Sequence, residues 1–232
     1  MKRIEQRERT KAALLDAAAE EFEARGYIGT VLSTISDRLG LTKGSLYFYF
    51  PTKAELAAAV VASYFEAWEP LIRESRKEHR SGLAALIWLS YRVADQYRDN
   101  IRIRAAARLV RERELIDAPL PEPYVDWISN VQIFLREAQE NGEVAADLPI
   151  ESLAWQITAT FFGNQQISND LNNRQDLRQR VDDMWFFFLR ALSPKNVPAT
   201  PHVSATTIAA ATAADSITPS TIIAATSDTT GA

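Results

Sequence analysis

Two short helices joined by a glycine constrain the fold of this chain more than any other feature of its sequence. Residues Leu32–Leu39 have the length of two helical turns, and Gly40 suits the left-handed turn that would end them. Thr42 is placed to cap a second short helix over Lys43–Tyr49. Four apolar side chains can share one small core: Ile35, Leu39, Leu41 and Leu46. The segment therefore predicts a helix-turn-helix.

The apolar residues outside this segment also follow a helical spacing, and we find no convincing alternating pattern of a strand. Thr52 and Glu55 form a capping box for the next helix, which Pro70 is expected to bend. The sequence therefore predicts an all-α protein of about nine helices. Besides the two short ones, helices are expected over residues 4–25, 53–78, 82–98, 101–115, 123–141, 150–171 and 175–192.

Three parts are expected along the chain. Residues 1–52 hold the helix-turn-helix, and residues 53–193 form a larger helical domain. Residues 194–232 form a low-complexity tail, because Ala, Thr and Ser make up 23 of the 35 residues from Pro198 onward. Such a segment buries too little apolar area to offset the entropy lost on ordering, so we predict that it is disordered.

The composition excludes several classes of protein. The chain has no Cys, which rules out disulfides, thiolate metal sites and cysteine nucleophiles. Its only histidines are His79 and His202, and the second lies in the expected tail, so neither a metal nor a cofactor is predicted. The sequence contains no Gly-x-Ser-x-Gly motif, phosphate-binding glycine loop or His-Glu-x-x-His motif. We therefore do not expect an enzyme.

The outer face of the second short helix carries more donors and aromatic rings than a solvated face needs. Gly44 weakens that helix by about 1 kcal/mol relative to Ala, which suits a backbone that approaches another molecule closely. Lys43 and Lys53 offer charge to phosphate, and Tyr47 and Tyr49 offer hydroxyl groups. The residues expected to contact DNA are Thr42, Lys43, Gly44, Ser45, Tyr47, Phe48, Tyr49 and Lys53.

The distribution of charge favours the same interpretation. Residues 1–53 carry nine Lys or Arg against seven Asp or Glu, whereas the whole chain has a net charge of −4. A basic region that faces phosphate can therefore coexist with an acidic remainder. The alternative is a helix-turn-helix that serves only to pack helices together.

A longer motif connects these residues to a known family. Its members are Gly26-Tyr27, Thr30, Ile35, Gly40 to Phe50, Lys53 and Glu55-Leu56. This motif resembles the DNA-binding domain of TetR-family transcriptional repressors, although Val31 stands where the family usually has a second Thr or Ser. The form Thr-Lys-Gly-x-Leu-Tyr-Phe-x-Phe resembles the γ-butyrolactone receptors of actinomycete signalling. The resemblance implies a small N-terminal domain of three helices and a larger helical domain of about six.

The larger domain is rich in wide aromatic side chains, which come from several of its helices. Each of them can simply fill the core, but so many together favour a concave pocket for a small ligand. The segment from Pro123 to Trp127 resembles the Pro-x-x-x-Trp of the receptors, which implies that Trp127 lines the pocket. The residues expected to bind a ligand are Trp88, Tyr91, Trp127, Thr158, Phe161 and Gln165.

The last helix carries an apolar run that surrounds it on all sides, from Trp185 to Leu189. One subunit can cover only one face of such a helix, so a second copy is expected to cover the other. Burial within a single subunit is the alternative. The residues expected at the dimer interface are Val181, Trp185, Phe188 and Leu189.

Together, these features predict a dimeric repressor that binds a palindromic operator and is released by a small signalling molecule of the γ-butyrolactone type. Its partners would be double-stranded DNA, a second copy of the chain and a largely apolar effector, with no membrane involved. We expect it in the cytoplasm, on the nucleoid when bound to DNA. Two alternatives remain: a metabolite- or drug-sensing repressor of the same family, and a dimeric helical binding module without a DNA function.

Overall fold

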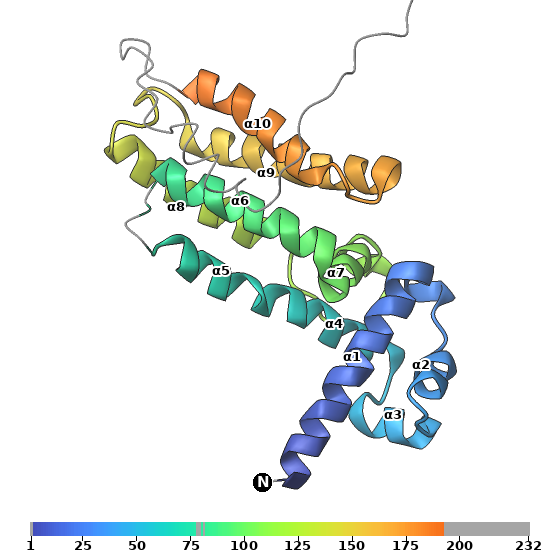
Figure 1. The fold of residues 1–232 in the computed structure, drawn as a ribbon. Coiled ribbons are helices and arrows are strands. Elements are labelled where there is room, and N and C mark those ends of the chain that lie inside the picture. Colours follow the sequence, from blue (N-terminus) through green and yellow to red (C-terminus); the bar gives the residue numbers. More distant parts are fainter. Residues whose placement is uncertain (1, 78–79, 81, 193–232) are drawn as a thin grey trace, which may run out of the picture. The chain divides into compact units, whose positions relative to one another are not determined.

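The computed structural model describes residues 2–77, 80 and 82–192, and all regular structure within them is helical (Figure 1). The ten α-helices of these residues are α1 (Lys2–Gly29), α2 (Leu32–Arg38), α3 (Lys43–Tyr49), α4 (Lys53–Glu66), α5 (Trp68–Ser75), α6 (Gly82–Asp99), α7 (Ile101–Arg111), α8 (Val125–Glu140), α9 (Ile150–Asn172) and α10 (Leu177–Leu192). A short 3₁₀-helix, Arg113–Leu115, follows α7. The all-α prediction is confirmed. The predicted tail, 194–232, lies outside the described residues, and the boundary between residues 52 and 53 stays a prediction.

The helix α1 continues beyond the end at Arg25 that the sequence suggested. Gly26 has φ +70° and ψ −179°, so it kinks the helix, and one further turn follows it. Two bonds hold that turn: the amide of Tyr27 donates to the carboxylate of Glu112, and the hydroxyl of Thr30 donates to the carbonyl of Gly26. Because Glu112 is remote in the chain, the sequence pattern around Gly26 could not show this continuation.

The helix expected over residues 53–78 is divided in two at Ala67, which is why ten helices replace the nine predicted. Pro70 does not make the break. It lies in the first turn of α5, where its missing N–H removes no helical hydrogen bond. The buried rings of Tyr64 and Trp68 meet edge-on across the break, with centroids 4.8 Å apart. The two rings therefore pack together across Ala67, whose own φ −70° and ψ −20° stay in the helical region.

The core of the larger part lies among α6, α8, α9 and α10, with α6 in contact with each of the other three (Figure 1). Phe134 of α8 and Val181 of α10 are fully buried there. The indole N–H of Trp185 donates to Ser90 of α6 over 2.8 Å, so the widest side chain of α10 points inward. On the other side of α6, α7 packs against both α4 and α1. This packing places α7 between the N-terminal helices and the core.

Candidate functional site

The helix-turn-helix predicted from the sequence is present as α2, a turn and α3. Gly40 adopts φ +63°, the left-handed conformation that the turn requires. The hydroxyl of Thr42 accepts the amide of Ser45 over 3.1 Å, which caps α3, and Thr52 caps α4 by accepting the amide of Glu55 over 3.0 Å. Both predicted caps are confirmed. They fix the start of α3 and of the helix that follows it.

The outer face of α3 is open to solvent. Lys43 and Gly44 are exposed, and Ser45 and Tyr49 are half-buried. The exposed fraction is 47% for Tyr47 and 68% for Phe48, high values for aromatic side chains in a well-packed unit. Contiguous exposed rings and donors of this kind favour a surface that another molecule covers.

The N-terminal part of α1 reaches this same face. The guanidinium group of Arg7 lies 5.4 Å from the ring centroid of Phe48. Lys53 is more restrained than the sequence suggested, because its Nζ donates to the carbonyl of Ile28 over 3.1 Å and lies 4.7 Å from the ring centroid of Tyr27. Partial burial lowers the pKa of Lys53. Lys53 is thus held against the end of α1 rather than extended into solvent.

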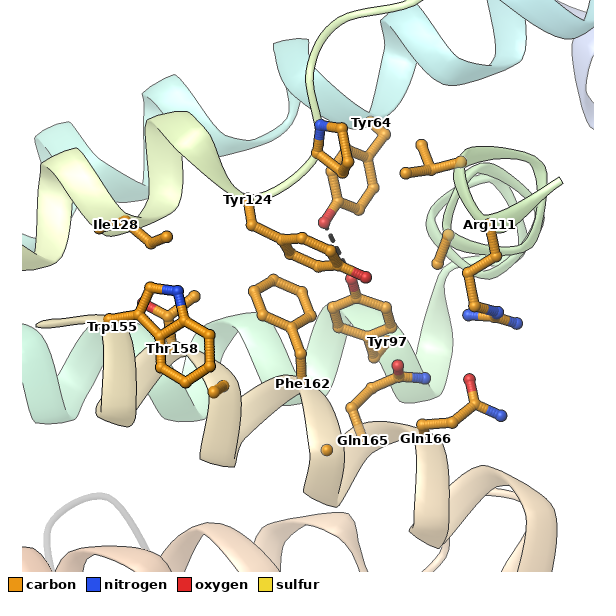
Figure 2. Close-up of a pocket in the computed structure, with 15 residues that line it drawn as sticks. Tyr64, Tyr97, Arg111, Tyr124, Ile128, Trp155, Thr158, Phe162, Gln165 and Gln166 are labelled. Carbon is orange, nitrogen blue, oxygen red and sulfur yellow. Dashed lines mark hydrogen bonds between the residues drawn. The ribbon is translucent and has the colours of Figure 1, made fainter. Parts of the chain in front are cut away.

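A cavity of about 510 Å³ opens in the larger part of the chain, bounded by α4, α6, α7, α8, α9 and the segment before α8 (Figure 2). Its lining consists of Tyr64, Tyr97, Ala107, Val110, Arg111, Pro123, Tyr124, Ile128, Trp155, Thr158, Ala159, Phe162, Gly163, Gln165 and Gln166. A neighbouring hollow of about 30 Å³, lined among others by Trp127, Thr158 and Phe161, touches the same wall of α9. A volume of several hundred Å³ suits a small organic ligand.

Four of the six predicted ligand-binding residues border these two spaces. Thr158 and Gln165 line the larger cavity, and Trp127 and Phe161 line the hollow beside it. Trp127 also forms part of a groove of about 400 Å³ on the other side of α8. The indole of Trp127 therefore separates the hollow from this groove.

Two predicted ligand-binding residues lie elsewhere, which corrects the sequence interpretation. The hydroxyl of Tyr91 donates to Asp182 of α10, so its ring is used in joining α6 to α10. The indole of Trp88 lies between two guanidinium groups, 4.8 Å from that of Arg80 and 5.7 Å from that of Arg92. Neither residue lines the cavity or the hollow.

Several cavity residues were missed by sequence reasoning, above all a group of tyrosines. The hydroxyls of Tyr64 and Tyr97 share a hydrogen bond of 2.9 Å, and Figure 2 shows the hydroxyl of Tyr124 beside them. Burial raises the pKa of Tyr64 to about 12 and raises that of Tyr97 well above its usual value. Both therefore keep their protons at neutral pH and offer neutral hydroxyls to the cavity. These tyrosines lie on separate segments of the chain, and nothing in the sequence pattern of either segment indicates that they meet.

The prediction for the dimer interface is corrected in part. Val181 is fully buried and Trp185 is 2% exposed within one subunit, so both belong to the inner face of α10. Phe188 and Leu189 are half-buried and remain candidates. The outer faces of α9 and α10 instead expose four large apolar side chains, Ile167, Leu171, Phe186 and Phe187.

The part of the chain that the structure describes contains neither a candidate metal site nor a membrane-spanning helix. Among those residues, no group of three or more acidic or histidine side chains could hold a metal ion. None of the helices that they form combines the length and the apolar character needed to cross a membrane.

Comparisons with known proteins agree with this architecture. Residues 14–60 match the model of bacterial regulatory proteins of the tetR family, and residues 80–194 match a tetracyclin repressor-like C-terminal domain. Over 190 residues the chain is 32% identical to the A-factor receptor protein of Streptomyces griseus, a match that covers 82% of this chain and 66% of that protein. The chain thus spans just under two thirds of the length of this relative.

Two solved structures share the fold over nearly their whole length. One is a gamma-butyrolactone receptor described as ArpA-like, with a TM-score of 0.74, 29% identity and coverage of 88% of this chain and 96% of that one. The other is the TetR family protein CprB of Streptomyces coelicolor in complex with its operator, with a TM-score of 0.77, 29% identity and coverage of 89% and 97%. The two family models together match more than half of the sequence, and the chain belongs to the TetR family of bacterial regulatory proteins.

Proposed function

We propose that this chain is a dimeric, ligand-responsive repressor that binds a palindromic operator and leaves it when a small autoregulator occupies the cavity. The observation that carries the proposal is the combination, in one unit, of an exposed donor-rich α3 and a cavity of about 510 Å³. The operator complex of CprB and the receptors among the relatives support it. A repressor of this kind would act in the cytoplasm, where its operator lies.

Contacts to DNA are assigned to the exposed side of α3 and its flanks. Lys43 would contact phosphate, and Phe48 would contact the methyl group of a thymine. Gly44 leaves the backbone of α3 open, because no atom lies within 3.9 Å of the place where a Cβ would stand. The side chain of Thr42 already caps α3, so its role would be to orient the helix.

The test of DNA binding is a titration of the upstream DNA of the gene with the wild type and with Lys43→Ala at several salt concentrations. Losing one phosphate contact should weaken binding to specific and unrelated DNA alike, and should reduce the log–log salt slope by about one unit. Lys77→Ala, the same change of charge at an exposed site after α5, is the control. An unchanged slope and affinity in Lys43→Ala would contradict this docking.

The second copy is proposed to cover the outer faces of α9 and α10. Four large apolar side chains are exposed there, each by more than half of its area, and the rings of Phe186 and Phe187 are in contact, with centroids 5.3 Å apart. Exposed apolar patches mark interfaces. A two-fold dimer would also present two copies of α3 to a palindromic site. This face leaves out Val181 and Trp185, which are buried within one subunit, and keeps Phe188 and Leu189 as candidates.

The effector class rests on the relatives that are named as receptors. A gamma-butyrolactone receptor shares this fold over 96% of its length, so we propose a signalling molecule of that general type. A metabolite- or drug-sensing repressor is the runner-up, since the cavity would also accept other small amphipathic compounds. Release of operator DNA by a panel of lactones, their ring-opened acids, drugs and metabolites separates the two, because only the autoregulator hypothesis requires the lactones or their acids to act at the lowest concentration.

A further inference from the structure

One wall of the cavity contains polar atoms that the protein itself leaves unsatisfied. Three residues of α9, one of them two turns before the other two, contribute buried atoms without a hydrogen-bond partner: Oγ1 of Thr158, Nε2 of Gln165 and Oε1 of Gln166. Gln165 is 2% exposed, so its amide lies within the wall rather than in bulk solvent. Leaving such an atom buried and unpaired costs about 1–3 kcal/mol. An occupant that supplies partners would remove this cost.

A cation stands at the end of the cavity where the two glutamines lie. Arg111 lines it from the last turn of α7, and Figure 2 shows its guanidinium group on the side where Tyr97, Gln165 and Gln166 lie. Within the described residues, Arg111 forms no hydrogen bond or ion pair. The carboxylate of Asp170, whose pKa Arg111 helps to lower, accepts both bonds that Nε2 of Gln166 donates and is also bonded by Asn169.

Arg111 belongs to a cluster of guanidinium groups but has no carboxylate partner of its own among the residues that the structure describes. Two further guanidinium groups, those of Arg104 and Arg174, belong to the same cluster, and both face the carboxylate of Glu23, at 3.2 and 3.6 Å. Three carboxylates face these three cations, those of Glu23, Asp170 and Asp99, and none of them forms an ion pair with Arg111. Arg174 is itself 5% exposed, and its Nε has no partner. The guanidinium group of Arg111 is therefore the one that an anion in the cavity could pair with.

The opposite end of the cavity is apolar. Phe162 borders both the cavity and the neighbouring hollow, whose walls are formed by aliphatic and aromatic side chains such as Trp127 and Met184. Trp155 and Ile128 continue this apolar lining on the side of the larger space. A ligand that fits both ends must be amphipathic.

We propose that the effector has an anionic oxygen head group of the carboxylate class, held by Arg111 and Gln165, and an apolar tail that lies along Phe162 toward the hollow. The proposal rests on the proposed function, because it specifies the effector of the same cavity. An uncharged lactone would accept hydrogen bonds from the same donors but would bring no negative charge to pair with the guanidinium group of Arg111. An anion adds a Coulombic attraction to the guanidinium group of Arg111 that a neutral carbonyl lacks, so the anion should be preferred.

The test compares two probes with the same carbon skeleton, γ-decalactone and its ring-opened salt, 4-hydroxydecanoate. Binding to the full chain is followed by tryptophan fluorescence, since Trp155 and Trp127 border the two spaces. We expect the carboxylate to bind about ten-fold more tightly than the lactone, which corresponds to about 1.4 kcal/mol. Equal binding, tighter binding of the lactone, or binding of neither probe would overturn the proposal.

Variants of Arg111 test whether this residue causes the preference for the carboxylate probe. Arg111→Gln keeps donors but removes the charge, so the ratio between the probes should fall to about one, whereas Arg111→Lys should restore part of it. Arg73→Gln makes the same change at an exposed position on α5 that lines none of the cavities, and should keep the full ratio. A preference that survives in Arg111→Gln would refute the assignment.

Failure of this inference and failure of the proposed function give different results. Operator binding without any probe should be the same in the wild type, Arg111→Gln and Arg73→Gln. A wild type that binds no operator would contradict the repressor function, while the ratio between the two probes could still be measured. A wild type that binds operator but does not distinguish the probes would contradict only the anionic head group.

Discussion

The kink at Gly26 allows a quantitative test of how α1 is joined to α7. With φ +70° and ψ −179°, this residue lies in a region that is open almost only to glycine. A Cβ at Gly26 would lie 2.6 Å from Oε1 of Glu112 and 2.8 Å from Nη2 of Arg108. Both atoms belong to side chains that bind α1, because Glu112 accepts the amide of Tyr27 and Arg108 donates to the carbonyl of Glu23 over 2.6 Å.

The substitution Gly26→Ala should therefore cost free energy in two ways. Forcing a residue with a side chain into this backbone region costs about 1–3 kcal/mol. Displacing Glu112 from the amide of Tyr27 removes a hydrogen bond to a charged group, which contributes about 1.5–3 kcal/mol. Together we expect the free energy of unfolding to fall by about 3–5 kcal/mol, a large part of the stability of an ordinary domain.

The assay is urea denaturation at a fixed protein concentration, because dimer formation makes the apparent stability depend on concentration. Gly29→Ala is the matched control, since its nearest new contact would be the Cβ of Arg25 at 3.2 Å and its φ is not positive. The double variant Gly26→Ala with Glu112→Ala should cost less than the sum of the single changes, because the contact is lost only once. A cost below about 1 kcal/mol for Gly26→Ala, or strict additivity, would refute this account.

Three other perturbations test different parts of the structure. Phe187→Glu should yield folded monomers in ultracentrifugation, because this side chain is 69% exposed in one subunit; a dimer that persists would exclude the outer face of α10. In the wild type, the unfolded Tyr64 ionises near pH 10, while the native residue, with its pKa raised to about 12, stays protonated, so the free energy of unfolding falls between these two pH values. Tyr64→Phe should make this fall shallower, by the slope that corresponds to about one proton. Urea titrations across that pH range measure it. Arg108→Met should leave probe binding intact but reduce release of operator DNA by ligand, as measured by fluorescence anisotropy; unchanged release would remove α7 from the coupling.

The helix-turn-helix could be predicted in detail because its determinants are local. The caps of α3 and α4 join residues three positions apart, and Gly40 sets its turn by its own conformation. The kink at Gly26 and the break at Ala67 were not predictable in the same way. The kink depends on Glu112, which lies 85 positions away in the chain, whereas the break at Ala67 lies between two aromatic residues one turn apart, whose ring packing the sequence pattern does not show.

The cavity could be predicted only in part, because the sequence shows which residues share a helix face but not which helix that face meets. Thr158 and Gln165 were found, since α9 presents them together to the cavity. Tyr91 lies at an equally suitable position of α6, yet its hydroxyl reaches Asp182 instead. Trp185 lies in an apolar run, which predicts that it is buried but not by which surface. Its hydrogen bond to Ser90 shows that the burial occurs within the subunit.

The structure favours two routes for the coupling between cavity and DNA. α4 begins beside the end of α1 at Lys53 and reaches the cavity at Tyr64. α7 lines the cavity with Val110 and Arg111, while its Arg108 binds the backbone of α1.

A ligand at Arg111 would therefore act on the same short helix that holds α1, without needing to move α4 first. Coupling free energies are typically about 1–3 kcal/mol, and linkage requires operator DNA to weaken ligand binding by the same factor by which ligand weakens operator binding. If α7 carries most of that coupling, Arg108→Met must reduce both effects equally. If α4 carries most of it, both effects must survive the change.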